Sequence, residues 1–314
     1  MLIQFAVENY RSIKKRAVIS FVASGDKSSE KYLIHSGEGM TLLPVLAICG
    51  ANAAGKSNVL YAIMAMKEMV VGKAAKVSKG KKLPWEPFAG TTEPTAFEVV
   101  FIFQGVRYTY GFLFDEKQIY KEYLSQRSDD HETLIFSREN GIYEFLENVN
   151  EQMVMSSRTP DNKLYLVSSN DWNLPQTENA YRWFQEKLTF LIDKESAAST
   201  TAVQIARDND KKARIIKEFL RADLGITDIT IGNGLDNTPI ITTTHQIINK
   251  DGTAEEIRLL MEQESAGTQH FFAYIGGWLQ VLENGALLVV DKIEDSLHPL
   301  LVRYLIEMIQ DKTS

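Results

Sequence analysis

The sequence contains very little cysteine and no long apolar segment. Cys49 is the single cysteine among 314 residues, which excludes an internal disulfide and favours a reducing compartment. We expect Cys49 to be a small buried strand residue and not a nucleophile. No apolar run reaches the about 18 residues that a membrane-spanning helix needs. The segment Met1–Phe5 lacks the basic region and apolar core of a signal peptide, so we predict a cytoplasmic chain with no membrane segment.

An excess of positive charge is also missing. The formal net charge is −7 and the sequence pI is near 5.4. Because nucleic acid is a polyanion, an acidic chain does not favour general nucleic-acid binding, although a local basic patch can still act. The five histidines, at positions 35, 131, 245, 270 and 298, lack metal-ligand spacing. No catalytic Ser–His–Asp set, nuclease carboxylate group or internal repeat is evident, and 44% hydrophobic residues indicate a globular protein.

A phosphate-binding sequence stands at residues 50–57. Gly50-Ala51-Asn52-Ala53-Ala54-Gly55-Lys56-Ser57 satisfies G-x-x-x-x-G-K-[ST] at every fixed position. Small side chains let successive backbone N–H groups converge on a phosphate, while Lys56 reaches the β- and γ-phosphates and the Ser57 hydroxyl can ligate Mg²⁺. We predict a buried strand over residues 42–49 and a helix from Asn58 onward, whose positive dipole end points at the same anion.

A second group of polar motifs lies at residues 264–300. Ser265 and Gly267 stand just before an apolar helix, where they offer a hydroxyl and N–H groups to an anion, although an ordinary N-cap would look the same. The apolar strand 285–290 ends in Asp291, the place where a P-loop fold puts a carboxylate beside Mg²⁺. Pro299 fits the first turn of a helix over residues 300–310.

The remaining segments predict a mixture of strands and helices. Alternating apolar residues indicate two short strands within residues 1–22 and a β meander over residues 95–145, with a turn at Gln104-Gly105. Residues 178–222 show helical periodicity, and residues 226–248 return to β-type runs. The aromatic residues of the meander are expected in a core and not on a binding face.

A lysine-rich segment follows the helix after the phosphate loop. Five lysines and two glycines between residues 72 and 82 indicate a flexible loop. Two interpretations stay open: a solvated connector, or a contact to the phosphate backbone of DNA or RNA. Base stacking gets no support, because no aromatic side chain is interleaved. The lysines are Lys73, Lys76, Lys79, Lys81 and Lys82.

The motifs, taken in order, resemble those of ABC-type AAA family ATPases. They are Asn9-Tyr10-Arg11-Ser12, Gly50–Asn58, Glu264–Thr268, Asp291 and Ser296–Pro299. Such ATPases are similar to SMC and RecF heads and are common in bacterial abortive-infection, retron and Septu-type anti-phage systems. The resemblance runs from residue 8 to about 310. It implies an α/β P-loop NTPase fold, an ABC-ATPase-like head with an antiparallel β meander and a helical lobe. It also implies one domain over 1–314, with a nucleotide-binding core at 1–85 and 263–314, a β region at 86–175, and a helical lobe and β return at 176–262.

The resemblance also implies roles for single residues. Gly50–Ser57 with Asn58 would be the Walker A motif that binds ATP, and Asp291 would be the Walker B carboxylate, sharing Mg²⁺ with Ser57. Ser265, Ala266, Gly267 and Thr268 would be the ABC signature, which contacts the γ-phosphate bound by a second subunit. Ser296-Leu297-His298 would be the D-loop, and Arg11 matches a basic residue near the nucleotide. One loop and one signature per chain imply a head-to-tail homodimer around two ATP molecules.

Two departures from the family pattern bear on catalysis. The family carries Glu after the Walker B Asp, but Lys292 stands there, and a charged ammonium cannot accept a proton from water. We therefore predict intact ATP binding with slow turnover. In addition, the family continues with another core strand and a switch histidine, and neither His270 nor His298 takes that place. We expect a fragment or a shortened, C-terminally truncated member.

Three functions remain for testing from the sequence. The favoured one is an ATP-driven switch that controls an effector, a nuclease or toxin subunit. The alternative is a DNA-engaging repair or maintenance head of RecF/SMC type, disfavoured by the negative charge and by the lack of sustained heptads. The third is a scaffold in which ATP is only structural.

Overall fold

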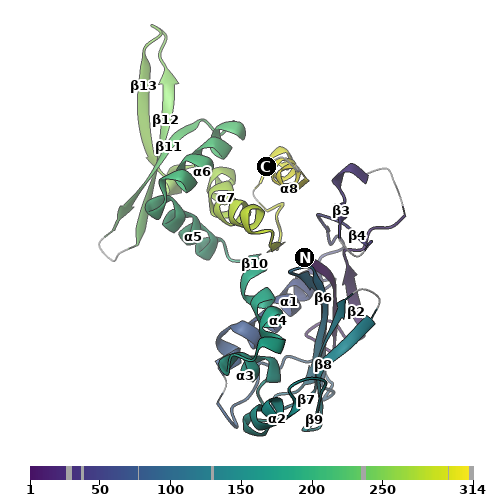
Figure 1. Cartoon of the computed structure of the whole chain (residues 1–314). Helices are drawn as coiled ribbons and strands as arrows, with labels where there is room; N and C mark the ends of the chain where they lie inside the picture. The colour runs from purple at the N-terminus through teal and green to yellow at the C-terminus, as the bar shows by residue number, and fades with distance from the viewer. Residues whose placement is uncertain are drawn as a thin grey trace. The chain divides into compact units, whose positions relative to one another are not determined.

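The computed structural model describes residues 1–25, 30–36, 39–76, 78–128, 131–234, 238–295 and 297–310. These residues form two compact units, unit 1 over Met1–Leu188 and unit 2 over Thr189–Ser314, shown in Figure 1. The boundary falls inside the segment 176–262, which the sequence assigns to one helical lobe. The arrangement of the chain as a single nucleotide-binding domain stays a prediction.

Unit 1 is organised on a seven-stranded sheet with the order β2-β1-β5-β6-β7-β8-β9, in which all neighbours are antiparallel. The predicted β meander is therefore confirmed. The strands are β1 Leu2–Glu8, β2 Ala17–Ser20, β5 Thr95–Phe103, β6 Val106–Phe114, β7 Ile119–Ser128, β8 His131–Glu139 and β9 Ile142–Phe145. A small second sheet pairs β3 Ile34–His35 with β4 Thr41–Leu42, after the short helix η1 Glu30–Tyr32.

The β5–β6 hairpin forms because its turn suits the twist of its strands. Gln104 and Gly105 have φ of 51° and 79°, the left-handed pair that a two-residue type I′ turn requires. The aromatic side chains of the hairpin are buried, as expected. Phe97 lies against the rings of Tyr10 and Phe112, with centroids 5.5 and 5.6 Å away. Such pairs add about 0.5–1.5 kcal/mol each beyond the apolar area that they bury.

Helices cover this sheet in unit 1. They are α1 Lys56–Val71, η2 Lys73–Lys76, α2 Val149–Arg158, α3 Tyr165–Asp171 and α4 Pro175–Glu186. Trp183 of α4 stacks on Phe101 of β5 with centroids 4.1 Å apart, so α4 packs directly against the sheet. The sequence did not predict α2 and α3, which lie inside the segment expected to be β structure.

A buried carboxylate links β7 to α3. Glu122 accepts hydrogen bonds from Tyr110 Oη at 3.0 Å and from the backbone N–H groups of Tyr165 at 2.6 Å and Leu166 at 3.0 Å. Arg138 stands opposite Glu122 in the β7–β8 ladder. Burial raises the pKa of Glu122, and the positive charge of Arg138 acts against that rise. Glu122 thus caps α3, whose own N-cap residue, Leu164, makes no side-chain hydrogen bond to the helix.

Unit 2 combines helices with a three-stranded antiparallel sheet. Its helices are α5 Lys194–Arg207, α6 Asn209–Arg221, η3 Met261–Gln263, α7 Ala266–Asn284 and α8 Pro299–Gln310. The sheet joins β11 Ile226–Asn233, β12 Pro239–Ile248 and β13 Ala254–Leu260 in that order, and β10 Leu188–Leu191 pairs with β14 Leu287–Val290. Figure 1 shows β12 and β13 as a long hairpin at the end of this unit.

Helix α7 runs through the core of unit 2. Phe271, Phe272 and Ile275 are fully buried, and the glycine pair in the middle of the helix lets its neighbours come close. A Cβ on Gly276 would lie 3.0 Å from the Thr201 Cα of α5, and one on Gly277 would lie 2.9 Å from Leu191. Glycine inside a helix costs about 1 kcal/mol relative to alanine, so close packing against α5 and β10 is the physical reason for both.

Two expectations around the phosphate loop are wrong. Strand β4 ends at Leu42, and the described residues 43–55 form no strand; Leu46 and Ile48 are 36% and 37% exposed. Cys49 is exposed and not buried. The apolar side chains favoured a strand, but a strand also needs a neighbouring backbone to bond with. In the described part of unit 1, no strand pairs with residues 43–49. Within the described residues, no helix has the length and apolar character to cross a membrane.

Candidate nucleotide-binding site

The phosphate loop closes on its own lysine. Lys56 Nζ donates hydrogen bonds to the carbonyl oxygens of Gly50, at 2.8 Å, and Ala51, at 2.9 Å. The backbone N–H of Ala54 also reaches the Ala51 carbonyl, at 3.3 Å. The backbone of residues 50–56 thus folds around the Lys56 ammonium group, which places a positive charge at the N-terminus of helix α1.

Gly55 is required at its position for two reasons. Its φ is +89°, the left-handed region, and a Cβ there would lie 2.7 Å from Ser12 Oγ. It also occupies the N-cap of α1, where it offers no side-chain hydrogen bond to the first turn. The N-cap residue thus supplies no side chain to the helix start, which is an arrangement that suits an anion.

The loop Asn9–Ser12 lies beside the phosphate loop within unit 1. Ser12 Oγ accepts a hydrogen bond of 2.7 Å from Asn58 Nδ2, in the first turn of α1. Ser12 was not among the predicted site residues, although its position next to Arg11 in the quoted motif was the available signal. Asn9 and Arg11 have φ of 51° and 46°, so this loop turns sharply toward α1.

Arg11 is held by a carboxylate and by an aromatic ring. Its Nε lies 2.5 Å from Oε2 of Glu86, and its backbone N–H donates to the Glu86 carbonyl at 2.8 Å. The guanidinium carbon lies 4.9 Å from the centre of the Tyr61 ring of α1. The hydrogen bond to Glu86 raises the pKa of Arg11 above its ordinary value. Arg11 therefore reaches the first turns of α1, and no sequence pattern pointed to Glu86 as its partner.

The signature residues form the start of helix α7 in unit 2. Ser265 is the N-cap, and its Oγ accepts a hydrogen bond from the Thr268 backbone N–H at 3.1 Å. The hydroxyl groups of Ser265 and Thr268 are 2.8 Å apart. The N–H groups of Ala266 and Gly267 belong to the first turn, which has no intrahelical acceptor. This arrangement offers hydroxyl and N–H donors at one helix end.

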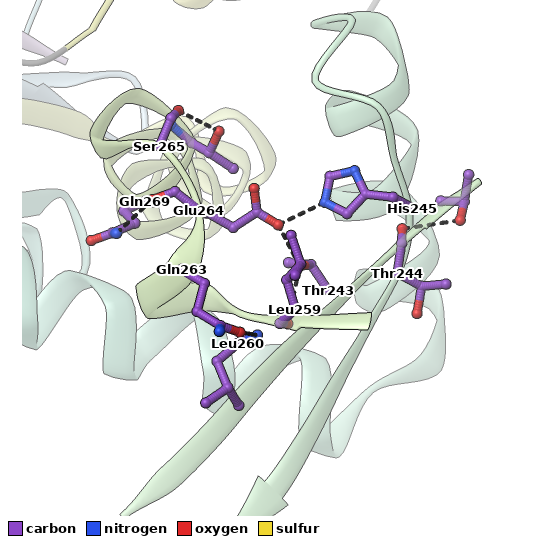
Figure 2. A network of polar contacts seen from close by, with 11 residues as sticks. Thr243, Thr244, His245, Leu259, Leu260, Gln263, Glu264, Ser265 and Gln269 are labelled. Atoms are coloured by element: carbon purple, nitrogen blue, oxygen red, sulfur yellow. Dashed lines mark hydrogen bonds and ion pairs between the residues drawn. The ribbon is translucent and has the colours of Figure 1, made fainter. Parts of the chain in front are cut away.

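Glu264, directly before the signature serine, turns toward the sheet of unit 2. Its Oε1 accepts hydrogen bonds from Thr243 Oγ1 at 2.5 Å and from His245 Nε2 at 2.7 Å, as Figure 2 shows. Its backbone carbonyl accepts a hydrogen bond of 2.9 Å from Gln269 Nε2. The sequence did not single out Glu264, Thr243 or His245 as a group, because the bonds join residues 19 and 21 positions apart.

Asp291 and Lys292 follow strand β14 at the edge of unit 2. Lys292 has φ of 52°, and its carbonyl accepts a hydrogen bond of 2.9 Å from the Asp295 N–H. His270 Nδ1 lies 2.6 Å from the Asp295 carbonyl oxygen. Burial, then the charges of Asp295 and Asp291, raise the pKa of Tyr274. The loop after β14, which carries Asp291, Lys292 and Asp295, therefore packs against the first turns of α7 through His270.

The predicted D-loop is described only in part, since Ser296 lies outside the described residues. Leu297 is buried, and the His298 carbonyl accepts hydrogen bonds from the N–H groups of Leu301 and Val302 at the start of α8. Pro299 is the first residue of α8, as predicted. His298 thus has a structural role in beginning a helix.

The structure divides the predicted site residues between the two units. Arg11 and the phosphate-loop residues Gly50–Asn58 lie in unit 1, and Ser265, Gly267, Thr268, Asp291 and Lys292 lie in unit 2. Among the described residues, no group of three or more His, Cys, Asp or Glu side chains gathers as a metal site. Ser57 in unit 1 and Asp291 in unit 2 each carry a hard oxygen donor of the kind that Mg²⁺ prefers, and their role as its ligands stays a prediction.

A loop that closes on its lysine at an uncapped helix start defines a class, the P-loop nucleotide-binding domains. Residues 45–314 match the family described as "AAA domain, putative AbiEii toxin, Type IV TA system". Because this match covers more than half of the chain, the chain belongs to that family of AAA domains. The predicted fold class, an α/β P-loop ATPase of ABC-like type, is confirmed.

Other comparisons add little. No curated protein matches the chain. Among solved structures, the chain is similar to "Crystal structure of the SmcHead bound to the C-winged helix domain of ScpA", with 13% identity and a TM-score of 0.36; the match covers 98% of this chain and 86% of that one. A similarity at this level does not bear on function. The roles assigned to single residues from the family resemblance therefore stay predictions.

Proposed function

We propose that this chain is an ATP-driven switch, which dimerises around ATP and regulates an effector protein. The observation that carries the proposal is the phosphate loop, in which Lys56 is held over the carbonyls of Gly50 and Ala51 at the start of α1. A β- or γ-phosphate is a stronger partner for an ammonium than two neutral carbonyls, because the bond is then charged on both sides. Binding of ATP would therefore draw Lys56 off the loop.

The proposed dimer uses one half-site from each subunit. ATP and Mg²⁺ bind to Gly50–Ser57, with Ser57 and Asp291 as protein ligands of the metal, and Arg11 lies near the phosphates. The signature residues Ser265, Gly267 and Thr268 of the second subunit contact the γ-phosphate through hydroxyl and N–H donors. Support comes from the N-terminal position of Ser265 on α7, where the helix dipole favours negative charge.

Turnover is proposed to be slow. Lys292 follows Asp291, and a charged ammonium cannot act as the general base that orients the attacking water. Mg²⁺ would supply charge neutralisation on the phosphates when bound. The dimer would then persist with intact ATP.

The biological role we propose is bacterial anti-phage defence, with a nuclease or toxin as the effector. It rests on the family description, which names a putative AbiEii toxin and a Type IV toxin–antitoxin system. The fold hosts many functions, so this step is an analogy at family level.

The test is the nucleotide that the protein retains. The chain is incubated with Mg-ATP, desalted and denatured, and the released nucleotide is identified by chromatography. We expect intact ATP at near one molecule per chain, and none with Lys56→Ala. Release of ADP alone would contradict slow turnover, and the absence of any nucleotide would contradict the switch.

A second candidate function, contact with nucleic acid, is favoured by one observation. The lysine-rich segment is not simply a flexible loop, because Asn162 Nδ2, on a residue only 3% exposed, donates to the carbonyls of Ser78 at 2.9 Å and Lys81 at 2.8 Å. Gly80 has φ of +78°, so residues 78–81 form a fixed turn that presents its lysines to solvent.

Salt-dependent binding distinguishes this second function. If the lysines bind phosphates, replacing Lys79 and Lys81 by Gln should weaken binding to a DNA or RNA duplex and reduce the salt slope by about 0.9 for each lysine removed from a phosphate. Lys211→Gln with Lys217→Gln, on α6 of unit 2, is the charge-matched control. If both double variants weaken nucleic-acid binding equally, the binding is a general effect of charge and the turn at residues 78–81 is not a specific contact.

A further inference from the structure

The contact of Glu264 with strand β12 has a consequence for the signature. The Glu264 side chain is 8% exposed, Thr243 is fully buried and the His245 side chain is 21% exposed, so the bond from Thr243 is shielded from water and the bond from His245 is partly so. An ionised carboxylate can only accept, so His245 must carry its proton on Nε2. Thr243 Oγ1 also lies 3.2 Å from the Leu259 carbonyl, but a hydroxyl has one proton, and the 2.5 Å contact to a charged oxygen is the stronger.

Strand β12 is a rigid support for these two donors. It is the central strand of its sheet, with Thr243 opposite Ile229 on β11 and Leu259 on β13. Thr243 and His245 are two residues apart, so their side chains leave the same face of the strand. Figure 2 shows both side chains directed at the Glu264 carboxylate. Both bonds end on the single oxygen Oε1, which fixes that oxygen in two directions.

Glu264 is bound on its other side to helix α7. Its carbonyl accepts from Gln269 Nε2, and its N–H donates to the Met261 carbonyl at 3.2 Å. The next residue is Ser265, whose hydroxyl is set by Thr268. A shift of Glu264 would therefore move the backbone of Ser265 and the first N–H groups of α7 with it. Glu264 does not cap α7, because Ser265 does so, and its side chain points away to the sheet.

We infer that Thr243 and His245 are positioning residues for the signature, acting through Glu264. They lock the start of α7 to the β11–β13 sheet, so that Ser265, Ala266 and Gly267 present their donors to a phosphate without first being ordered. This inference rests on the proposed function, in which those donors meet the ATP held by a second subunit. Pre-ordered donors bind a phosphate more strongly, because less conformational freedom is lost on binding.

The test compares two quantities for each variant: the Mg-ATP concentration that gives half of the protein as dimer, and the affinity of the monomer for a fluorescent ATP analogue. Thr243→Val keeps the shape of a fully buried side chain and removes one donor to Glu264. We expect dimer formation to need about tenfold more Mg-ATP, because a hydrogen bond to a charged group is removed, while monomer affinity stays unchanged.

Matched variants separate positioning from folding. Thr244→Val changes the same residue type on the other face of β12, where Thr244 is bonded through its carbonyl to Thr227, and should change neither quantity. His245→Ala should act as Thr243→Val does, and His245→Gln, which keeps a donor, should restore dimer formation to within about threefold of the wild type. Glu264→Gln keeps the Oε1 acceptor but removes its charge, so its dimer formation should lie between that of the wild type and that of Thr243→Val.

The outcomes are distinct. Dimer formation by Thr243→Val and His245→Ala at the wild-type Mg-ATP concentration would overturn the inference and leave the switch intact. Equal weakening in Thr243→Val and Thr244→Val would also overturn it, since only general stability would then be involved. A wild-type protein that binds ATP and stays monomeric would overturn the proposed dimer, and the positioning role with it.

Discussion

The half-site in unit 1 and the half-site in unit 2 are built by different means. In unit 1, backbone carbonyls, a left-handed glycine and one lysine shape the phosphate loop within eight consecutive residues, 50–57. In unit 2, side chains from β12 set the residue before Ser265 through hydrogen bonds across 19 and 21 positions. The shape of the phosphate loop therefore depends on local sequence, whereas the position of the N-terminus of α7 depends on the position of strand β12.

The largest effect is expected on the stability of unit 1, at Glu122, which lies outside the nucleotide-binding site. Glu122→Ala would remove the acceptor for Tyr110, Tyr165 and Leu166 and leave three buried donors without it, at a cost of about 1–3 kcal/mol for each. We expect unit 1 to melt at lower temperature, while the transition of unit 2 is unchanged, in calorimetry. Glu139→Ala, at an exposed glutamate of the same sheet, should cost less than about 1 kcal/mol. Equal shifts would contradict the special role of Glu122.

The same carboxyl should give unit 1 a pH dependence. Because burial raises the pKa of Glu122 in the folded state above its value in the unfolded chain, the folded state holds this proton more strongly. The stabilisation is therefore present at low pH and falls as pH rises from the ordinary value of 4.5 through the raised pKa. Urea unfolding at stepped pH should show this loss, and Glu122→Gln should flatten it. A profile of Glu122→Gln parallel to the wild type would contradict the assignment.

A second large effect is expected at Lys292 in unit 2. Lys292→Glu would supply a group that can orient and accept a proton from water, and general-base catalysis is worth about 10²–10⁴-fold. We expect ATP turnover, followed by phosphate release, to rise by about a hundredfold. Lys292→Gln removes the charge without adding a base and is the control. A similar gain in both variants would mean that the ammonium inhibits by charge, and no gain in either would favour an ATP that is only structural.

A smaller effect is expected where the backbone of unit 1 shapes the loop. Gly55→Ala would force a side chain into the left-handed region and against Ser12, at a cost of about 1–3 kcal/mol. We expect ATP affinity to fall by about tenfold or more in titration calorimetry. Gly90→Ala, at φ of +83° and outside the phosphate loop, is the control for backbone strain elsewhere in unit 1 and should leave ATP affinity unchanged.

The smallest effect is expected at the pair that holds Arg11. Glu86→Gln should weaken the grip on the guanidinium and let it turn to the phosphates, which would tighten ATP binding by about threefold, as befits a partly exposed ion pair. Arg11→Gln should weaken ATP binding instead. If both variants weaken ATP binding equally, Glu86 supports the site and does not compete for Arg11.

Features that are formed by residues close together in the sequence could be predicted, and features that need residues far apart in the sequence could not. The phosphate loop, helix α1 and the Gln104-Gly105 hairpin follow from consecutive residues, and they were predicted. Helix α3 was not, because its cap comes from Glu122, 43 positions earlier than Tyr165. Strand β13 was not, because its side chains are mostly exposed on both faces and show no alternation. Three partner residues were not predicted either, because each contacts its partner only in the folded chain. Glu86 binds Arg11, Asn162 binds the turn at residues 78–81, and Thr243 binds Glu264.

The expected strand at residues 42–49 shows the opposite error. Its run of apolar side chains indicates burial, but such a run does not show which other strand would form backbone hydrogen bonds with this segment. The lysine segment was likewise described from its composition, while the fixed turn at residues 78–81 depends on the buried amide of Asn162.

The central claim is that the phosphate loop of one chain and the signature of another complete one ATP site. Mixing two inactive variants tests it most directly. Lys56→Ala removes the phosphate-loop lysine, Ser265→Arg blocks the signature, and neither alone should dimerise in Mg-ATP. In the mixture, the phosphate loop of the Ser265→Arg chain meets the intact signature of the Lys56→Ala chain. Light scattering with nucleotide analysis should then show a dimer holding one ATP; a mixture that stays monomeric, while the wild type dimerises, would contradict the claim.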